Sequence, residues 1–177
     1  MQPKDLFRFC PRCGAACEHG GNPLKCSACG LHLFFNPTCA TAAYIFDSQN
    51  RALFVKRAKE PAKGKLAIPG GFIDIGESAE DALRREVREE VNLEIEGIAF
   101  LLSCPNSYAY RDVTYPVCDF IFTARAVDAG AAQSLDGVES HSWRLVKDVE
   151  PDELAFPSLR AGLVLLARSA SEGCQPH

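Results

Sequence analysis

The sequence contains no apolar run long enough to span a bilayer and no charged-then-apolar leader. It also lacks an excess of basic residues, because 19 Lys and Arg against 23 Asp and Glu give a formal net charge of −4 at pH 7. A protein that follows nucleic-acid phosphates needs a basic surface, which this composition does not provide overall. We therefore expect a cytoplasmic protein with no membrane partner, and the charge argues against a nucleic-acid partner.

Nine cysteines in 177 residues could indicate a secreted disulfide scaffold, but their arrangement argues otherwise. Four of them form two CxxC pairs, and the other five are scattered along the chain. This pattern favours a reduced chain with a metal site. With 47% hydrophobic and 24% charged residues, the remainder suits one globular domain of ordinary size with a small appendage.

The two CxxC pairs lie within residues 1–38, each followed by a glycine, with twelve intervening residues rich in Gly, Asn and Pro. Four thiolates at this spacing suit tetrahedral Zn²⁺. Because so short a segment buries little apolar surface, we expect the metal to supply much of its folding free energy. The predicted ligands are Cys10, Cys13, Cys26 and Cys29. A redox dithiol is the alternative, and Cys17 or His19 could compete as ligands. Few basic residues surround the pairs, so we expect a structural or dimerising ribbon, which leaves a homodimer open.

A helix is predicted over residues 79–91. No Gly or Pro interrupts this stretch, and Leu83, Val87 and Val91 recur every four residues. Ser78 with Asp81 three residues later marks the helix start. Before it, Gly70 and Gly71 follow a proline, so the backbone there can approach another group closely.

Three acids lie on one side of this helix. Glu86, Glu89 and Glu90 fall beside the apolar stripe, where they repel each other unless a cation lies among them. Mg²⁺ prefers such carboxylates together with water and phosphate. Arg85, four residues before Glu89, can pair with it. The alternative interpretation is an ordinary solvated charged face.

The spacing around these acids is long and specific: Gly71, five residues, Glu77, seven residues, then REVREE at 85–90. This pattern resembles the Nudix box, with one departure, because Asn92 stands where the box usually has glycine. Asn is the next most tolerant residue for a left-handed helix end. The resemblance implies a Nudix-type α/β/α sandwich over residues 39–177. It implies Mg²⁺ or Mn²⁺ as the catalytic metal, and the catalytic or metal-binding residues would be Arg85, Glu86, Glu89, Glu90 and the Gly70 carbonyl.

Further strands and a second helix are predicted around the box. The expected strands are 39–46, 52–57, 95–103, 116–126 and 141–146, and the expected helix is 158–170, with fraying over 169–177. Many Nudix enzymes add an acid from a later loop, and Glu139 is the candidate metal ligand, although it precedes Trp143 by four residues where the pattern often has three. A solvent-exposed Glu at a strand edge fits as well. Arg57 and Lys65, from a basic cluster before the box, and Tyr108 are candidate substrate-binding residues, with solvated and ordinary strand roles as alternatives.

A zinc ribbon followed by a Nudix box resembles the NADH pyrophosphatase branch. That branch carries an S-Q-P-W-x-F motif, and here Ser103, Pro105 and the aromatic Tyr108 agree, while Cys104 and Asn106 depart. We therefore expect metal-dependent hydrolysis of a nucleoside diphosphate linked to another group, such as NADH, ADP-ribose or FAD, without a strong preference for NADH. The alternative is a non-catalytic nucleotide-sensing or RNA-binding Nudix module. Such a module would be expected to lose box acids, and here none is missing.

Overall fold

The computed structural model describes residues 1–171 and divides the chain into two compact units. The first unit contains Met1–Thr38 together with Ser107–Val117, and the second contains Cys39–Asn106 and the chain from Cys118 onward. The sequence places a boundary at residue 38, but it gives no sign that residues 107–117 join the first unit. The sequence predicts fraying over residues 169–177. Helix α2 extends to Ser171, and residues 172–177 lie outside the described part of the chain.

The first unit has little regular structure. It contains the short 3-10 helix η1 (Pro3–Leu6) and a two-stranded antiparallel sheet of β1 (Leu24–Lys25) and β2 (His32–Leu33). Within residues 1–38, the buried hydrophobic side chains are those of Cys10, Leu24 and Cys26. So small an apolar core supplies little folding free energy, which agrees with the expectation that a metal stabilises this segment.

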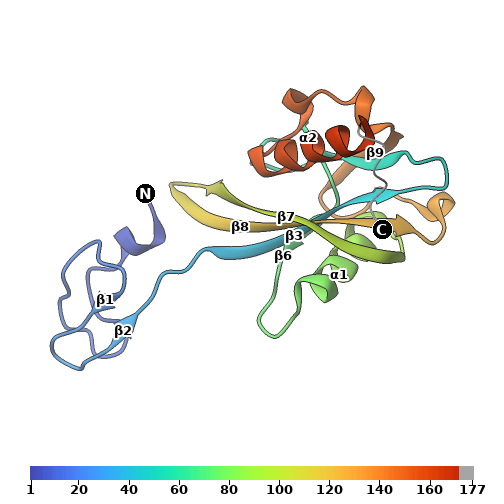
Figure 1. The fold of residues 1–177 in the computed structure, drawn as a ribbon. Helices are drawn as coiled ribbons and strands as arrows, with labels where there is room; N and C mark the ends of the chain where they lie inside the picture. Colours follow the sequence, from blue (N-terminus) through green and yellow to red (C-terminus); the bar gives the residue numbers. More distant parts are fainter. Residues whose placement is uncertain (172–177) are drawn as a thin grey trace. The chain divides into compact units, whose positions relative to one another are not determined.

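The second unit is built on a seven-stranded sheet, which Figure 1 shows. Part of its long hairpin, residues 107–117, belongs to the first unit. The strand order is β5-β4-β3-β8-β7, with β6 paired to β3 and β9 paired to β4. The strands are β3 (Thr38–Phe46), β4 (Ala52–Arg57), β5 (Leu66–Ala67), β6 (Gly70–Phe72), β7 (Ile95–Tyr110), β8 (Val113–Ala126) and β9 (Val138–Arg144). Strands β7 and β8 both run further than predicted. Pro105 lies in β7, which ends the sheet order, and proline is found in sheets mainly on such edge strands.

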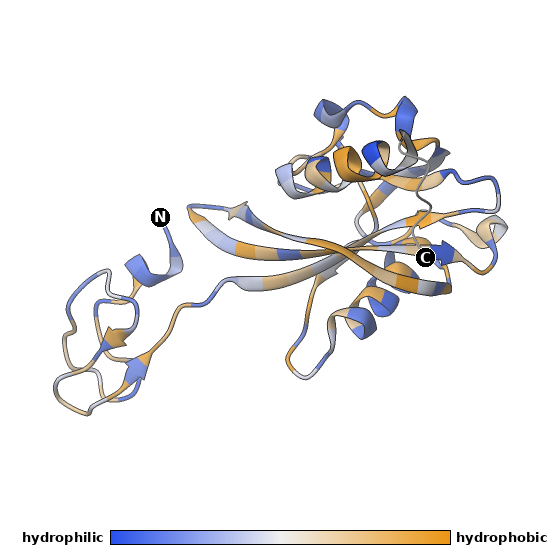
Figure 2. Ribbon diagram, in the orientation of Figure 1, coloured by the Kyte–Doolittle hydropathy of each residue, from blue (hydrophilic) through white to orange (hydrophobic). Residues whose placement is uncertain are grey.

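Two helices cover opposite faces of the sheet, α1 (Ala79–Val91) and α2 (Pro157–Ser171), as Figure 1 shows. On the α2 side, the Tyr44 hydroxyl of β3 donates to the Leu159 carbonyl at 2.6 Å. On the α1 side, Leu83, Val87 and Val91 are buried in the core. Figure 2 shows the hydrophobic residues concentrated on the central strands, between the helices. The predicted sandwich is confirmed. Short 3-10 helices η2 (Ala129–Ala131), η3 (Val146–Asp148) and η4 (Pro151–Glu153) lie in the connections.

Helix α1 has the predicted ends. Ser78 is the N-cap, and its side chain accepts a hydrogen bond from the Asp81 N–H. Asn92 ends the helix in the left-handed conformation with φ of 55°, which Asn tolerates as the sequence suggested. The loop before β9 then binds the free helix carbonyls, because the Leu135 N–H donates to the Glu90 carbonyl at 2.9 Å. These contacts hold both ends of the acidic helix in place. None of the described helices is both long and apolar enough to cross a membrane.

Candidate active site and metal centre

Arg85 connects the acids of α1 with the loop that precedes the helix. Its Nε and Nη2 donate to the two carboxylate oxygens of Glu77 at 2.8 and 2.9 Å. Its Nη1 donates to Glu86 at 2.8 Å and to Glu89 at 3.2 Å. The guanidinium lowers the pKa of Glu77 to about 2, with help from the Asp74 N–H. The sequence indicated only the pair with Glu89, so the bidentate pair with Glu77 is a finding of the structure.

Glu90 is the most buried acid of the helix. Its carboxylate accepts a hydrogen bond from the Gly70 N–H at 3.0 Å. Burial raises the pKa of Glu90 to about 7, and the charges of Glu86 and Asp136 act in the same direction, while Arg57 opposes them. A buried carboxylate that shares its surroundings with other acids is one that a cation would stabilise.

Glu86 lies directly over the glycine turn. A Cβ atom added to Gly71 would lie 2.4 to 2.6 Å from the Glu86 carboxyl group, so this turn leaves room for the acid only because residue 71 has no side chain. Burial raises the pKa of Glu86, and Arg85 partly offsets the shift. The glycine turn and the helix therefore form one acidic surface from β6 and α1.

Glu139 forms an ion pair with a lysine of β4. Its carboxylate binds the Lys56 ammonium at 2.7 Å. A register shift between β4 and β9 leaves Glu139 as the extra residue, because Lys56 pairs with Ser140 and Arg57 with Val138. A β-bulge re-aims the side chain of such a residue, and the sequence offers no signal for it. The later-acid role of Glu139 stays a prediction.

The predicted substrate-binding residues lie in different surroundings. The guanidinium of Arg57 lies 5.0 Å from the centre of the Phe156 ring, and its Nε donates to the Pro61 carbonyl at 2.9 Å. Because Arg57 opposes the pKa shift of Glu90, its charge acts on the acidic surface. Lys65 donates to the Asp152 carbonyl at 3.1 Å. Tyr108 belongs to the first unit.

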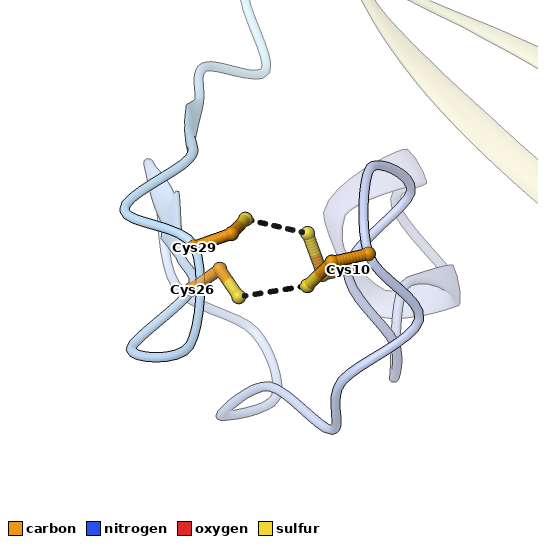
Figure 3. Close-up of side chains that lie close together, drawn as sticks. Cys10, Cys26 and Cys29 are labelled. Carbon is orange, nitrogen blue, oxygen red and sulfur yellow. Dashed lines mark hydrogen bonds between the residues drawn. The ribbon is translucent and has the colours of Figure 1, made fainter.

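The four predicted zinc ligands converge in the first unit. Figure 3 shows Cys10 facing Cys26 and Cys29. All four sulfur atoms lie within 4.8 Å of each other, and the Cys10–Cys29 and Cys13–Cys26 pairs are each 3.6 Å apart. Tetrahedral Zn²⁺ with Zn–S bonds of about 2.3 Å needs sulfur separations of about 3.8 Å, so this set fits zinc. Backbone N–H groups, chiefly that of Cys29, lower the pKa of Cys26 to about 6, which favours a thiolate ligand. No other group of three metal-binding side chains in the described chain converges as closely.

One polar cluster was not predicted. Asp119 of β8 is almost fully buried and accepts hydrogen bonds from Asn106 of β7 and Ser158 of α2. The three residues are far apart in the sequence. Only Asn106 was noted there, because it differs from the NADH pyrophosphatase motif.

Known proteins resemble both the sequence and the fold. An ADP-ribose pyrophosphatase from Methanocaldococcus jannaschii is 36% identical over 115 residues, which cover 64% of this chain and 65% of that protein. The human mitochondrial NAD(P)H pyrophosphatase NUDT13 is 32% identical over 99 residues, covering 56% of this chain and 28% of that protein. The chain thus spans less than two thirds of the length of either. The crystal structure of a NUDIX hydrolase from Nitrosomonas europaea has a TM-score of 0.73 at 21% identity, and the match covers 96% and 95% of the two chains.

The family model described as the NUDIX domain matches residues 37–164. This segment contains both helices of the second unit up to residue 164, the glycine turn and the acidic surface on α1. It leaves the four-cysteine cluster outside. The chain therefore belongs to the NUDIX domain family.

Proposed function

We propose that the chain is a metal-dependent pyrophosphohydrolase that cleaves a nucleoside diphosphate linked to another group. The observation that carries this proposal is the clamp of Arg85, which holds Glu77, Glu86 and Glu89 next to the buried Glu90. A chain that merely kept the fold would not need to keep four acids so close together at a cost in repulsion.

Glu86, Glu89 and Glu90 are the proposed ligands of Mg²⁺ or Mn²⁺, with the Gly70 carbonyl as a further ligand. Carboxylate oxygens on one surface suit a hard divalent cation, and burial together with the neighbouring acids raises the pKa of Glu86 and of Glu90, an effect that a bound cation would oppose. When bound, such a cation would neutralise phosphate charge and acidify the attacking water. Glu86 or a neighbouring acid is the proposed acceptor of a proton from that water, and the hydrogen bond from Arg85 orients the Glu86 carboxylate.

Arg57 is the proposed contact for the substrate phosphates. Its Nε donates to the Pro61 carbonyl and its guanidinium lies over the Phe156 ring, so the position of the guanidinium is fixed. The first unit is proposed to be a structural zinc ribbon over residues 1–38, and residues 39–177 the catalytic domain. Zn²⁺ would be held by the four clustered cysteines, a reduced and cytoplasmic setting would suit them, and a homodimer through the ribbon is compatible with this arrangement.

The relatives narrow the proposed substrates. The names of two of them refer to ADP-ribose and to NAD(P)H. These compounds share an adenosine diphosphate half and differ in the group attached to it. We propose that this chain accepts several such compounds without a strong preference for NADH, since Cys104 and Asn106 replace the Gln and Trp of the NADH pyrophosphatase motif.

The test is a panel of NADH, ADP-ribose and FAD assayed with Mg²⁺ and with Mn²⁺, using the wild-type chain and Glu89→Gln. The substitution removes one charge at almost constant volume, and Glu89 is more than half exposed, so the melting temperature should hardly change. We expect kcat to fall by at least about a hundredfold. A Gln variant with wild-type turnover would refute the metal-site assignment. A hundredfold preference for NADH would refute the specificity argument alone.

A further inference from the structure

The cluster of Asp119, Asn106 and Ser158 has no part in the chemistry proposed above. The Asn106 amide donates to Asp119 Oδ2 at 2.8 Å, and the Ser158 hydroxyl donates to the same oxygen. Asp119 is only 7% exposed. Burying a carboxylate in this way is costly, and a helix could be anchored to a sheet by a neutral side chain at lower cost. The retained charge therefore calls for an explanation.

The second carboxylate oxygen of Asp119 is differently placed. In the described part of the chain, Oδ1 accepts no hydrogen bond. It is not sealed in the core either, because the only buried side-chain oxygen or nitrogen without a partner among the described residues is Thr41 Oγ1. One oxygen is thus fixed by two donors, while the other has no partner in the described chain and keeps a small solvent-accessible area. This arrangement presents an oriented acceptor, which is the form of a recognition group rather than of a buried anchor.

The location of the cluster relates it to the acidic surface. Asp119 shares a face of β8 with Ile121, and a Cβ atom added to Gly162 of α2 would lie 3.4 Å from Ile121. Asp119 therefore lies at the start of α2, where Ser158 contacts it. Arg57 bridges the two regions, since it lies against Phe156, two residues before Ser158, and its charge acts on Glu90. A phosphate bound at Arg57 would leave the nucleoside directed either toward the start of α2 or away from it.

We propose that Asp119, held in place by Asn106 and Ser158, is a specificity-determining residue whose free oxygen accepts a hydrogen bond from the 6-amino group of adenine. This inference rests on the proposed function, because adenosine diphosphate is the half that the candidate substrates share. A carboxylate accepts from an amino group but repels a carbonyl, so hypoxanthine, which carries oxygen at this position, is rejected. Asn106 and Ser158 act as positioning residues.

The experiment compares matched bases. We expect the wild-type chain to cleave NADH with a kcat/KM about 10- to 100-fold above that for its hypoxanthine analogue, and to bind AMP more tightly than IMP in calorimetry with Mg²⁺. In Asp119→Asn, the amide oxygen takes the place fixed by Asn106 and Ser158, and the NH₂ group faces the base. The preference should then be lost or reversed. Asp112→Asn makes the same charge change on an exposed residue outside the cluster and should keep the wild-type ratio.

Each outcome decides the matter. If Asp119→Asn lowers the melting temperature and leaves the adenine-to-hypoxanthine ratio unchanged, the cluster is structural and the inference is wrong. A wild-type chain without base preference also refutes it. If no diphosphate is cleaved, the proposed function fails, while the AMP-to-IMP binding ratio still decides the role of Asp119. Should the Asn variant not fold, Ser158→Ala keeps the Asn106 donor, and an unchanged ratio in that variant refutes the inference.

Discussion

Two adjacent glycines should respond to the same substitution in opposite ways. In Gly71→Ala, the new methyl group would lie 2.4 Å from Glu86 Cδ and 2.5 and 2.6 Å from its two oxygens. Ordinary contacts are about 3.5 Å, so the carboxylate must move by about 1 Å. The obstructing atoms are the end of a flexible side chain, and this movement costs little folding free energy. The Arg85–Glu86 hydrogen bond of 2.8 Å would be distorted.

Activity should suffer far more than stability in this variant. A displacement of about 1 Å at a catalytic group can lower the rate by about a hundredfold. We therefore expect kcat/KM for ADP-ribose to fall by about a hundredfold, with a melting temperature within a few degrees of the wild type. Thermal unfolding followed by circular dichroism gives the melting temperature, and a phosphatase-coupled assay of the two monophosphate products, AMP and ribose 5-phosphate, gives kcat/KM on the same preparation.

Gly70→Ala provides the matched comparison. Here the added Cβ would lie 2.1 Å from the Thr41 carbonyl oxygen and 2.5 Å from the Ala42 Cα atom, and φ is 150°. Backbone atoms cannot swing aside, so this variant should lose most of its stability or fail to fold. The reasoning is refuted if Gly71→Ala keeps wild-type kcat/KM, or if it unfolds as readily as Gly70→Ala does.

Two further predictions concern the metal and the hairpin turn. Protein purified without chelator should contain about one Zn²⁺ per chain, and elemental analysis that finds no zinc would count against the site. Removing the metal should increase the rate of amide hydrogen exchange over residues 1–38, while the second unit stays folded. Asp47 accepts hydrogen bonds from the Gln49 and Arg51 N–H groups and from the Arg51 side chain, which outweigh its burial and lower its pKa. The stabilisation by the Asp47 carboxylate is therefore present above the unfolded pKa of about 3.9 and is lost as pH falls through the lower folded pKa. Asp47→Asn should lower the free energy of unfolding in urea by about 1–3 kcal/mol at pH 7, and by less at pH 3. An equal loss at both pH values would contradict this account.

Local signals in the sequence were sufficient for the acidic helix. Ser78 and Asn92 fix its two ends through side-chain and backbone chemistry within a few residues, and the structure has α1 over the predicted range. The four zinc ligands were equally accessible, because each CxxC turn is a local motif and only the pairing of two motifs is long-range.

Long-range contacts were not accessible in this way. The bulge at Glu139 depends on the register in which β9 pairs with β4, and the residues near 139 give no sequence signal for it. Asp119 meets Ser158 across 39 residues, so a single sequence gives no reason to relate them. The Arg85–Glu77 pair is intermediate, since it spans eight residues across the helix start and depends on the path of the loop before Ser78.

The hairpin tip at residues 107–117 makes the first unit discontinuous along the chain, because the Thr114 N–H donates to the Met1 carbonyl at 2.8 Å. A fragment that begins at residue 39 would keep the tip but strip away the segment it pairs with. The opposite fragment, residues 1–38 alone, would lack part of its own unit. Cutting the chain at residue 38 would therefore not give two intact pieces. A fusion that moves this ribbon to another protein would have to include the hairpin tip as well.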